Sequence, residues 1–141
     1  MRTTIFRSLA VLGMVAFTSS IDPVKGLTAK PDLVIGAFID AQMHNDAKLI
    51  KEILDDNAVV NVSRGKTIIK HTKMELLGFY KKIGYVTLNC KASYEILSES
   101  ESVILSRVDF KFDHFTQQNF LTIQKDKDNN WKVVNINRFN V

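Results

Sequence analysis

The spacing of apolar residues changes once along this chain, and this change constrains the fold more than any other feature. Up to about Ile83 the apolar residues recur with helical spacing, interrupted by one short hairpin pattern; from Tyr85 to the C-terminus they alternate. A period near 3.6 predicts helices, and a period of 2 predicts strands with one buried face. Segregation of the two patterns predicts an α+β fold rather than an alternating α/β fold.

Two helices are predicted at the start of the folded region. The first covers about residues 31–44, because Pro31 is suited to the first turn of a helix. Asp46 is the predicted N-cap of the second, which ends near Leu54. Residues 55–57 are acidic and amide side chains that favour a turn.

A hairpin and a third helix complete the first part. The hairpin strands are predicted at 58–62 and 67–69. Thr72 and Glu75 have the spacing of a capping box, so a helix is expected from this point to about Ile83. Its side chains expected to point inward are Leu76, Phe79, Tyr80 and Ile83.

The alternating part predicts four long antiparallel strands, at 85–96, 103–113, 116–125 and 131–139. A strongly twisted sheet that curls around helices encloses a cone. The open end of such a cone is a pocket, and the outer face must meet water or a second subunit. The expected fold is therefore three N-terminal helices packed on a strongly curved antiparallel sheet.

Residues 1–20 have the pattern of a secretory signal peptide. Arg2 and Arg7 supply positive charge, and residues 9–17 form an apolar run followed by small residues. The run is too short for a membrane-spanning helix, which needs about 20 residues. We therefore expect a secreted or periplasmic protein with a cleaved leader at 1–20, a flexible tether at 21–30 and a folded domain at 31–141.

Composition limits the classes of partner. The chain has 141 residues, of which 45% are hydrophobic and 24% charged, as in one globular domain. Without Arg2 and Arg7, 17 of the 19 basic residues remain against 15 acidic ones, a formal charge of +2. This argues against a nucleic acid partner, and no membrane partner is expected after leader removal. Cys90 is the only cysteine, which excludes an intrachain disulfide and a thiolate metal site; no metal or cofactor is predicted.

Several short motifs give the chain a family resemblance. They are Phe38–Ala41 followed by Asn45–Ala47, the strand 58–62 after two aspartates, and the strand entry Asn130–Val133. Together these resemble the nuclear transport factor 2-like (NTF2-like or SnoaL-like) superfamily of cone-shaped α+β domains. Among its groups, the chain is most similar to the lumazine-binding group.

The resemblance implies a fold that hosts isomerases, dehydratases, binding modules and dimerisation domains, so function depends on the pocket. In ketosteroid isomerase-like members an Asp base abstracts a proton, while a Tyr and a protonated acid stabilise the oxyanion. The sequence does not match that set. We therefore expect a small-molecule-binding or scaffold domain without assignable catalysis, forming a homodimer through its sheet.

The expected pocket is aromatic. Where space remains inside the cone, a small flat apolar or heteroaromatic ligand would stack between rings and be oriented by hydroxyl groups. The alternative is that the same rings fill the cone as ordinary core. The predicted ligand-binding residues are Phe38, Tyr80, Tyr94, Ser106, Phe110 and Phe112.

An alternative function is proton transfer by an isomerase or dehydratase. Asp40 and His44 are four residues apart on the first predicted helix, so they share a face and can pair. A His held by a carboxylate can act as a general base where the pair faces a cavity. His114, which shares strand parity with Phe110, is the other candidate partner of Asp40. A local structural role is the competing interpretation of each residue.

Charged residues alternate on the opposite face of the second long strand. Arg107, Asp109 and Lys111 lie there, and their charges can pair across neighbouring strands. This pattern predicts an outer sheet face that is either solvated or part of a dimer surface.

Overall fold

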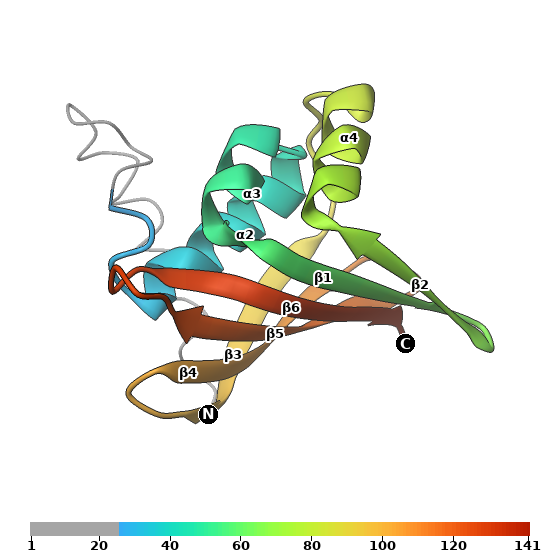
Figure 1. The fold of residues 1–141 in the computed structure, drawn as a ribbon. Coiled ribbons are helices and arrows are strands. Elements are labelled where there is room, and N and C mark those ends of the chain that lie inside the picture. The colour runs from blue at the N-terminus through green and yellow to red at the C-terminus, as the bar shows by residue number, and fades with distance from the viewer. Residues whose placement is uncertain (1–25) are drawn as a thin grey trace.

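A computed structural model describes residues 26–141, in which three helices cover one face of a six-stranded curved sheet (Figure 1). The α+β class is as predicted. The predicted leader and residues 21–25 of the predicted tether lie outside the described residues. Within the described part, Leu27 is buried in the core, next to the first helix. The described helices are all too short or too polar to span a membrane.

Strands and helices interleave in the first part of the chain. In chain order the elements are α2 (Pro31–His44), α3 (Ala47–Ile53), β1 (Leu54–Arg64), β2 (Thr67–Thr72), α4 (Lys73–Ile83), β3 (Lys91–Glu99), β4 (Val103–Lys111), β5 (Thr116–Lys125) and β6 (Trp131–Asn140). The prediction of three N-terminal helices is therefore wrong in one respect, because β1 and β2 separate α3 from α4.

The sheet has the order β2-β1-β6-β5-β4-β3 and is antiparallel except between β1 and β6. The expectation of a wholly antiparallel sheet is corrected at this pair. Leu54 lies opposite Val133 and Val62 opposite Arg138, so α3 delivers the chain to the end of the sheet at which β6 begins. Strand β6 pairs with β5 on one edge and with β1 of the β1–β2 hairpin on the other, so both of its edges are hydrogen-bonded. The hairpin extends past the helices (Figure 1).

The predicted helix caps are confirmed. The Asp46 carboxylate accepts hydrogen bonds from the backbone N–H groups of Lys48 (3.0 Å) and Leu49 (3.2 Å), which have no partner inside α3. Thr72 and Glu75 form the capping box of α4, with each side chain accepting from the other's backbone N–H. These contacts fix where α3 and α4 begin.

The first long strand begins later than predicted. Residues 85–90 are outside the sheet, and β3 starts at Lys91. The backbone N–H of Val86 donates to the carbonyl of His44, and that of Leu88 donates to Met43. The final carbonyls of a helix lack partners within it, so the end of α2 binds this segment before it reaches the sheet. Its alternating pattern therefore reflects packing against a helix.

The turn predicted at residues 55–57 is instead an irregularity inside β1. The Asp55 carboxylate accepts from the backbone N–H of Asn57 (2.9 Å), a local turn-like contact. The register of β1 on β6 shifts between Leu54 and Val59 at the same place. A bulge of this kind bends the strand without ending it.

The core lies between the helices and the concave face of the sheet. Phe38 of α2 and Phe110 of β4 are fully buried, with ring centroids 6.2 Å apart. Other fully buried side chains are Ile35, Ile50, Ile53, Leu54, Leu121, Ile123 and Ile136. The half of the concave face under α2 and α3 is thus filled with apolar side chains.

Candidate functional site

The concave face becomes polar toward the C-terminal end of β6. Leu121 of β5 lies opposite Ile136 of β6, and both are buried apolar residues. The next inward-facing pairs are Asn119 opposite Arg138 and Gln117 opposite Asn140. The same face of the sheet therefore changes from apolar to polar side chains within two residue pairs.

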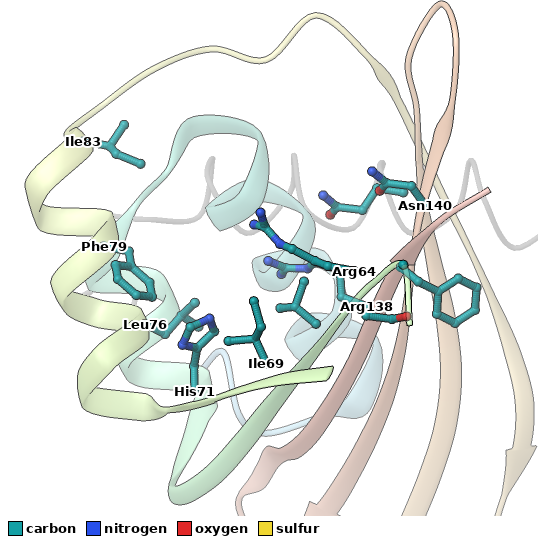
Figure 2. Close-up of a pocket in the computed structure, with 13 residues that line it drawn as sticks. Arg64, Ile69, His71, Leu76, Phe79, Ile83, Arg138 and Asn140 are labelled. Atoms are coloured by element: carbon teal, nitrogen blue, oxygen red, sulfur yellow. The ribbon is translucent and has the colours of Figure 1, made fainter. Parts of the chain in front are cut away.

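A pocket of about 1060 Å³ lies at this polar end, between α4, the β1–β2 hairpin and the end of β6 (Figure 2). We call it the mouth pocket. Its volume lies slightly above the range of about 300–1000 Å³ that is usual for small-molecule sites. The residues that line it are Val62, Ser63, Arg64, Gly65, Ile69, His71, Leu76, Phe79, Ile83, Gln117, Arg138, Phe139 and Asn140.

The apolar wall of the mouth pocket includes two residues that were expected to point into the core. Phe79 and Ile83 of α4 are 45% and 65% exposed, and only Leu76, Leu77 and Tyr80 of this helix are buried. The prediction that Phe79 and Ile83 are inward is wrong, because α4 covers the sheet only along one edge. In Figure 2 both side chains point from α4 toward the pocket.

The charged lining of the mouth pocket is entirely basic. Arg64 from the hairpin and Arg138 from β6 both reach into it (Figure 2), and His71 of β2 lies beside Phe79 with ring centroids 5.0 Å apart. The lining contains no Asp or Glu. These basic side chains create a positive electrostatic potential, which the low-dielectric walls of the pocket concentrate. The pocket therefore favours anions over cations.

The buried amide of Asn119 holds Arg138 in place. Its Nε donates to Oδ1 of Asn119 at 2.6 Å, and Asn119 Nδ2 donates to Oε1 of Gln117 at 3.1 Å. Asn119 has no exposed surface. A guanidinium can only donate, so Asn119 must present its oxygen to Arg138 and its amino group to Gln117. Gln117 must then accept through its oxygen, which leaves its amino group free to donate.

The guanidinium of Arg138 lacks a counter-charge among residues 26–141. Its Nη2 is buried without a hydrogen-bond partner there, and the described ion pairs do not include it. Burial lowers the pKa of Arg138, although the nearby Tyr80 opposes this. Burial likewise raises the pKa of Tyr80, whose hydroxyl donates to Gln42 Oε1, so Tyr80 is neutral and cannot balance the charge.

The six residues predicted to bind a ligand lie away from the mouth pocket lining. Phe38, Tyr80, Tyr94, Ser106 and Phe110 are buried. Phe112 stacks on Phe115 with ring centroids 4.8 Å apart and lines a smaller recess of about 320 Å³. Cys90 lines the same recess, where its thiol contacts Met43 and burial raises its pKa. Of the six, Tyr80 interacts with a residue of the mouth pocket lining, Arg138.

The structure brings two of the three predicted acid–base residues together. His44 Nε2 lies 3.6 Å from Asp40 Oδ1, and the other ring nitrogen lies 3.2 Å from the Tyr85 hydroxyl. Burial raises the pKa of Asp40, which His44 opposes. His114 is exposed in the turn between β4 and β5. All three are absent from the lining of the mouth pocket. Across residues 26–141, the histidines, cysteine and carboxylates do not gather into a group able to hold a metal.

The site residues predicted from the sequence do not include Arg138, Asn119 or Gln117. Asn119 alternates with the buried residues Leu121 and Ile123, so a polar residue at an inward position was a usable signal. Arg138 gave no such signal. Trp131 and Val133 face inward, but a bulge shifts the alternation so that Ile136 and Arg138 also face inward.

Comparison with protein-family models and with curated proteins gave no match to this sequence. Comparison with solved structures gave many. A protein from Shewanella baltica, described as NTF2-like and of unknown function, has a TM-score of 0.66 and 13% identity over 77% of this chain and 88% of that one. An NTF2-like protein of unknown function from Methylobacillus flagellatus has a TM-score of 0.65 and 15% identity over 86% and 94%.

A ketosteroid isomerase-like protein from Erwinia carotovora atroseptica has a TM-score of 0.60 and 14% identity, over 81% of this chain and 95% of that chain. At such low identities the likeness concerns the fold and leaves the chemistry to the site. The expected superfamily resemblance is thus confirmed at the level of architecture. This chain has the NTF2-like fold.

Proposed function

We propose that this protein binds a small molecule in the mouth pocket and has no catalytic role there. The observation that carries the proposal is the lining itself: apolar side chains from α4 and the hairpin face a few convergent polar groups from β5 and β6. That combination is typical of ligand sites, which gain affinity from apolar contact and orientation from a small number of polar groups. The pocket lies at the open end of the cone, where a ligand can enter without displacing the Phe38–Phe110 core.

The test is binding of the neutral naphthalene dye prodan, followed by its fluorescence. We expect saturable binding at one site per chain. Phe79→Ala removes an apolar wall of the mouth pocket and should weaken binding about fivefold, the effect of losing part of a buried aromatic contact.

Phe115→Ala is the matched control, because Phe115 is 40% exposed against 45% for Phe79 and lies outside the mouth pocket. It should leave the affinity unchanged. Equal losses in the two variants, or no saturable binding to the parent protein, would contradict the proposal. Lumazine serves as a second neutral probe, chosen because of the sequence resemblance to the lumazine-binding group.

Proton transfer by Asp40 and His44 is the second candidate function, favoured by their 3.6 Å contact. Ring resonances in NMR distinguish the two, because His71 lines the mouth pocket and His44 does not. If prodan shifts the signals of His71 alone, the binding proposal is supported. A ligand that shifts those of His44 would favour the enzymatic alternative.

Export and dimerisation complete the proposal. The predicted leader supports a secreted or periplasmic location, tested by N-terminal sequencing of the mature protein.

The convex face supports a homodimer, because Leu105 is 41% exposed there beside the partly exposed Arg107. Leu105→Arg should then convert a dimer to a monomer in light scattering. A parent protein that is monomeric at micromolar concentration would contradict the dimer.

A further inference from the structure

We propose that the ligand of the mouth pocket is an organic carboxylate, with its carboxylate against Arg138 and its apolar body against α4. This inference rests on the proposed function and adds the chemical class of the ligand. Three features of the pocket support it.

The first feature is an uncompensated charge. Arg138 is held on the concave face by Asn119, yet residues 26–141 supply no carboxylate to pair with it. Burying a charge without a partner is costly, so a protein retains one chiefly where something else neutralises it. An anion in the mouth pocket would do so, because Arg138 lines that pocket.

The second feature is the direction of the hydrogen bonds. Arg138 donates a hydrogen bond to Asn119, and Asn119 donates one to the side-chain oxygen of Gln117, which is the last acceptor of this series. All polar hydrogens of the Arg138 guanidinium are donors, and the amino group of Gln117 remains free to donate to the pocket. A ligand group that only accepts, as a carboxylate does, complements both.

The third feature separates an organic acid from an inorganic anion. The donors at the sheet face an apolar wall formed by Ile69, Phe79 and Ile83, each at least 40% exposed. Exposed apolar side chains at a pocket mouth gain free energy when an apolar ligand covers them. Arg64 at the hairpin turn adds positive charge at the entrance and is solvent-exposed. The combination suits a molecule with one anionic end and one apolar end.

The experiment compares 2-naphthoate with 2-naphthamide, which has nearly the same shape without the charge, by isothermal titration calorimetry on the full chain. We expect 2-naphthoate to bind at least about tenfold more tightly, because hydrogen bonds to charged groups contribute more than neutral ones. Arg138→Gln should remove this preference. Lys66→Gln is the matched control, since Lys66 lies in the same basic hairpin but outside the pocket lining, and it should keep the preference.

Arg138→Lys keeps the experiment decisive if Arg138→Gln fails to fold, as judged by circular dichroism. Lys retains the charge but loses the planar pair of donors, so the preference should fall several-fold without vanishing. If the parent protein binds both naphthyl probes equally, the carboxylate inference is overturned while the binding function stands. If prodan and both naphthyl probes all fail to bind, the proposed function falls as well.

Discussion

Arg107 and Arg138 lie on opposite faces of one sheet and differ in what neutralises them. On the convex face Arg107 reaches two carboxylates, Asp109 at 3.2 Å and Glu95 at 3.5 Å, and about a third of its side chain is exposed. On the concave face Arg138 contacts the neutral side chains of Asn119 and Tyr80. An arginine whose charge is already balanced by neighbouring carboxylates has no need of a ligand, whereas one left unbalanced beside a pocket is available to a ligand.

The largest expected effect on stability comes from removing the hydrogen-bond partner of Arg138, compared with removing a partner of Arg107. Asn119→Leu keeps the branching and the number of side-chain heavy atoms but leaves the Arg138 Nε without an acceptor in a buried position. It should lower the free energy of unfolding by about 3 kcal/mol, the penalty for an unsatisfied buried charged donor. Asp109→Asn, the matched change at Arg107, should cost less than about 1 kcal/mol, because Glu95 and water remain. Urea denaturation of both variants measures the difference; equal costs would remove the distinction between the two arginines.

A second change should reverse the first. Adding Arg138→Met to Asn119→Leu replaces both members of the contact by apolar side chains, and such replacements are often neutral or stabilising. The double variant should therefore regain about 2 kcal/mol or more relative to Asn119→Leu alone. The same urea titrations measure it. A double variant no more stable than the single one would mean that Arg138 is already compensated in the folded protein.

A third change makes Arg138 resemble Arg107. Asn119→Asp places a carboxylate at the position that now lies 2.6 Å from Arg138 Nε. Binding of 2-naphthoate should weaken about tenfold, which corresponds to about 1.4 kcal/mol, because the new carboxylate competes with the ligand for the same charge. Calorimetry at pH 7 measures it, with Asp109→Asn as a variant that should bind normally. An unchanged affinity would show that Arg138 is not the group that the carboxylate contacts.

The sequence predicted the scaffold better than the site, for reasons visible at particular residues. The helix caps at Asp46 and Thr72 depend on residues at most three positions away, so the local sequence is enough to predict them. The inward position of Arg138 depends on a bulge in β6. The position of β1 in the sheet depends on its pairing with β6, a strand more than seventy residues away along the chain. The local sequence predicts neither of these. The aromatic residues proposed as a ligand site are large enough to fill the cone, whereas the mouth pocket is marked by polar residues at inward positions.

The smallest expected effect tests whether Arg107 is as unimportant to stability as its surroundings suggest. Glu95 and Arg107 are cross-strand neighbours on β3 and β4, and each side chain is about one-third exposed. Solvent screens such a pair, so a double-mutant cycle with Glu95→Gln and Arg107→Gln should give a coupling of about 0.2–1 kcal/mol, decreasing as salt is added. A coupling above about 2 kcal/mol that salt does not reduce would mean that the convex face is desolvated in solution. The natural cause of that desolvation is a second subunit, so this outcome would weaken the contrast between the two arginines and strengthen the case for the homodimer.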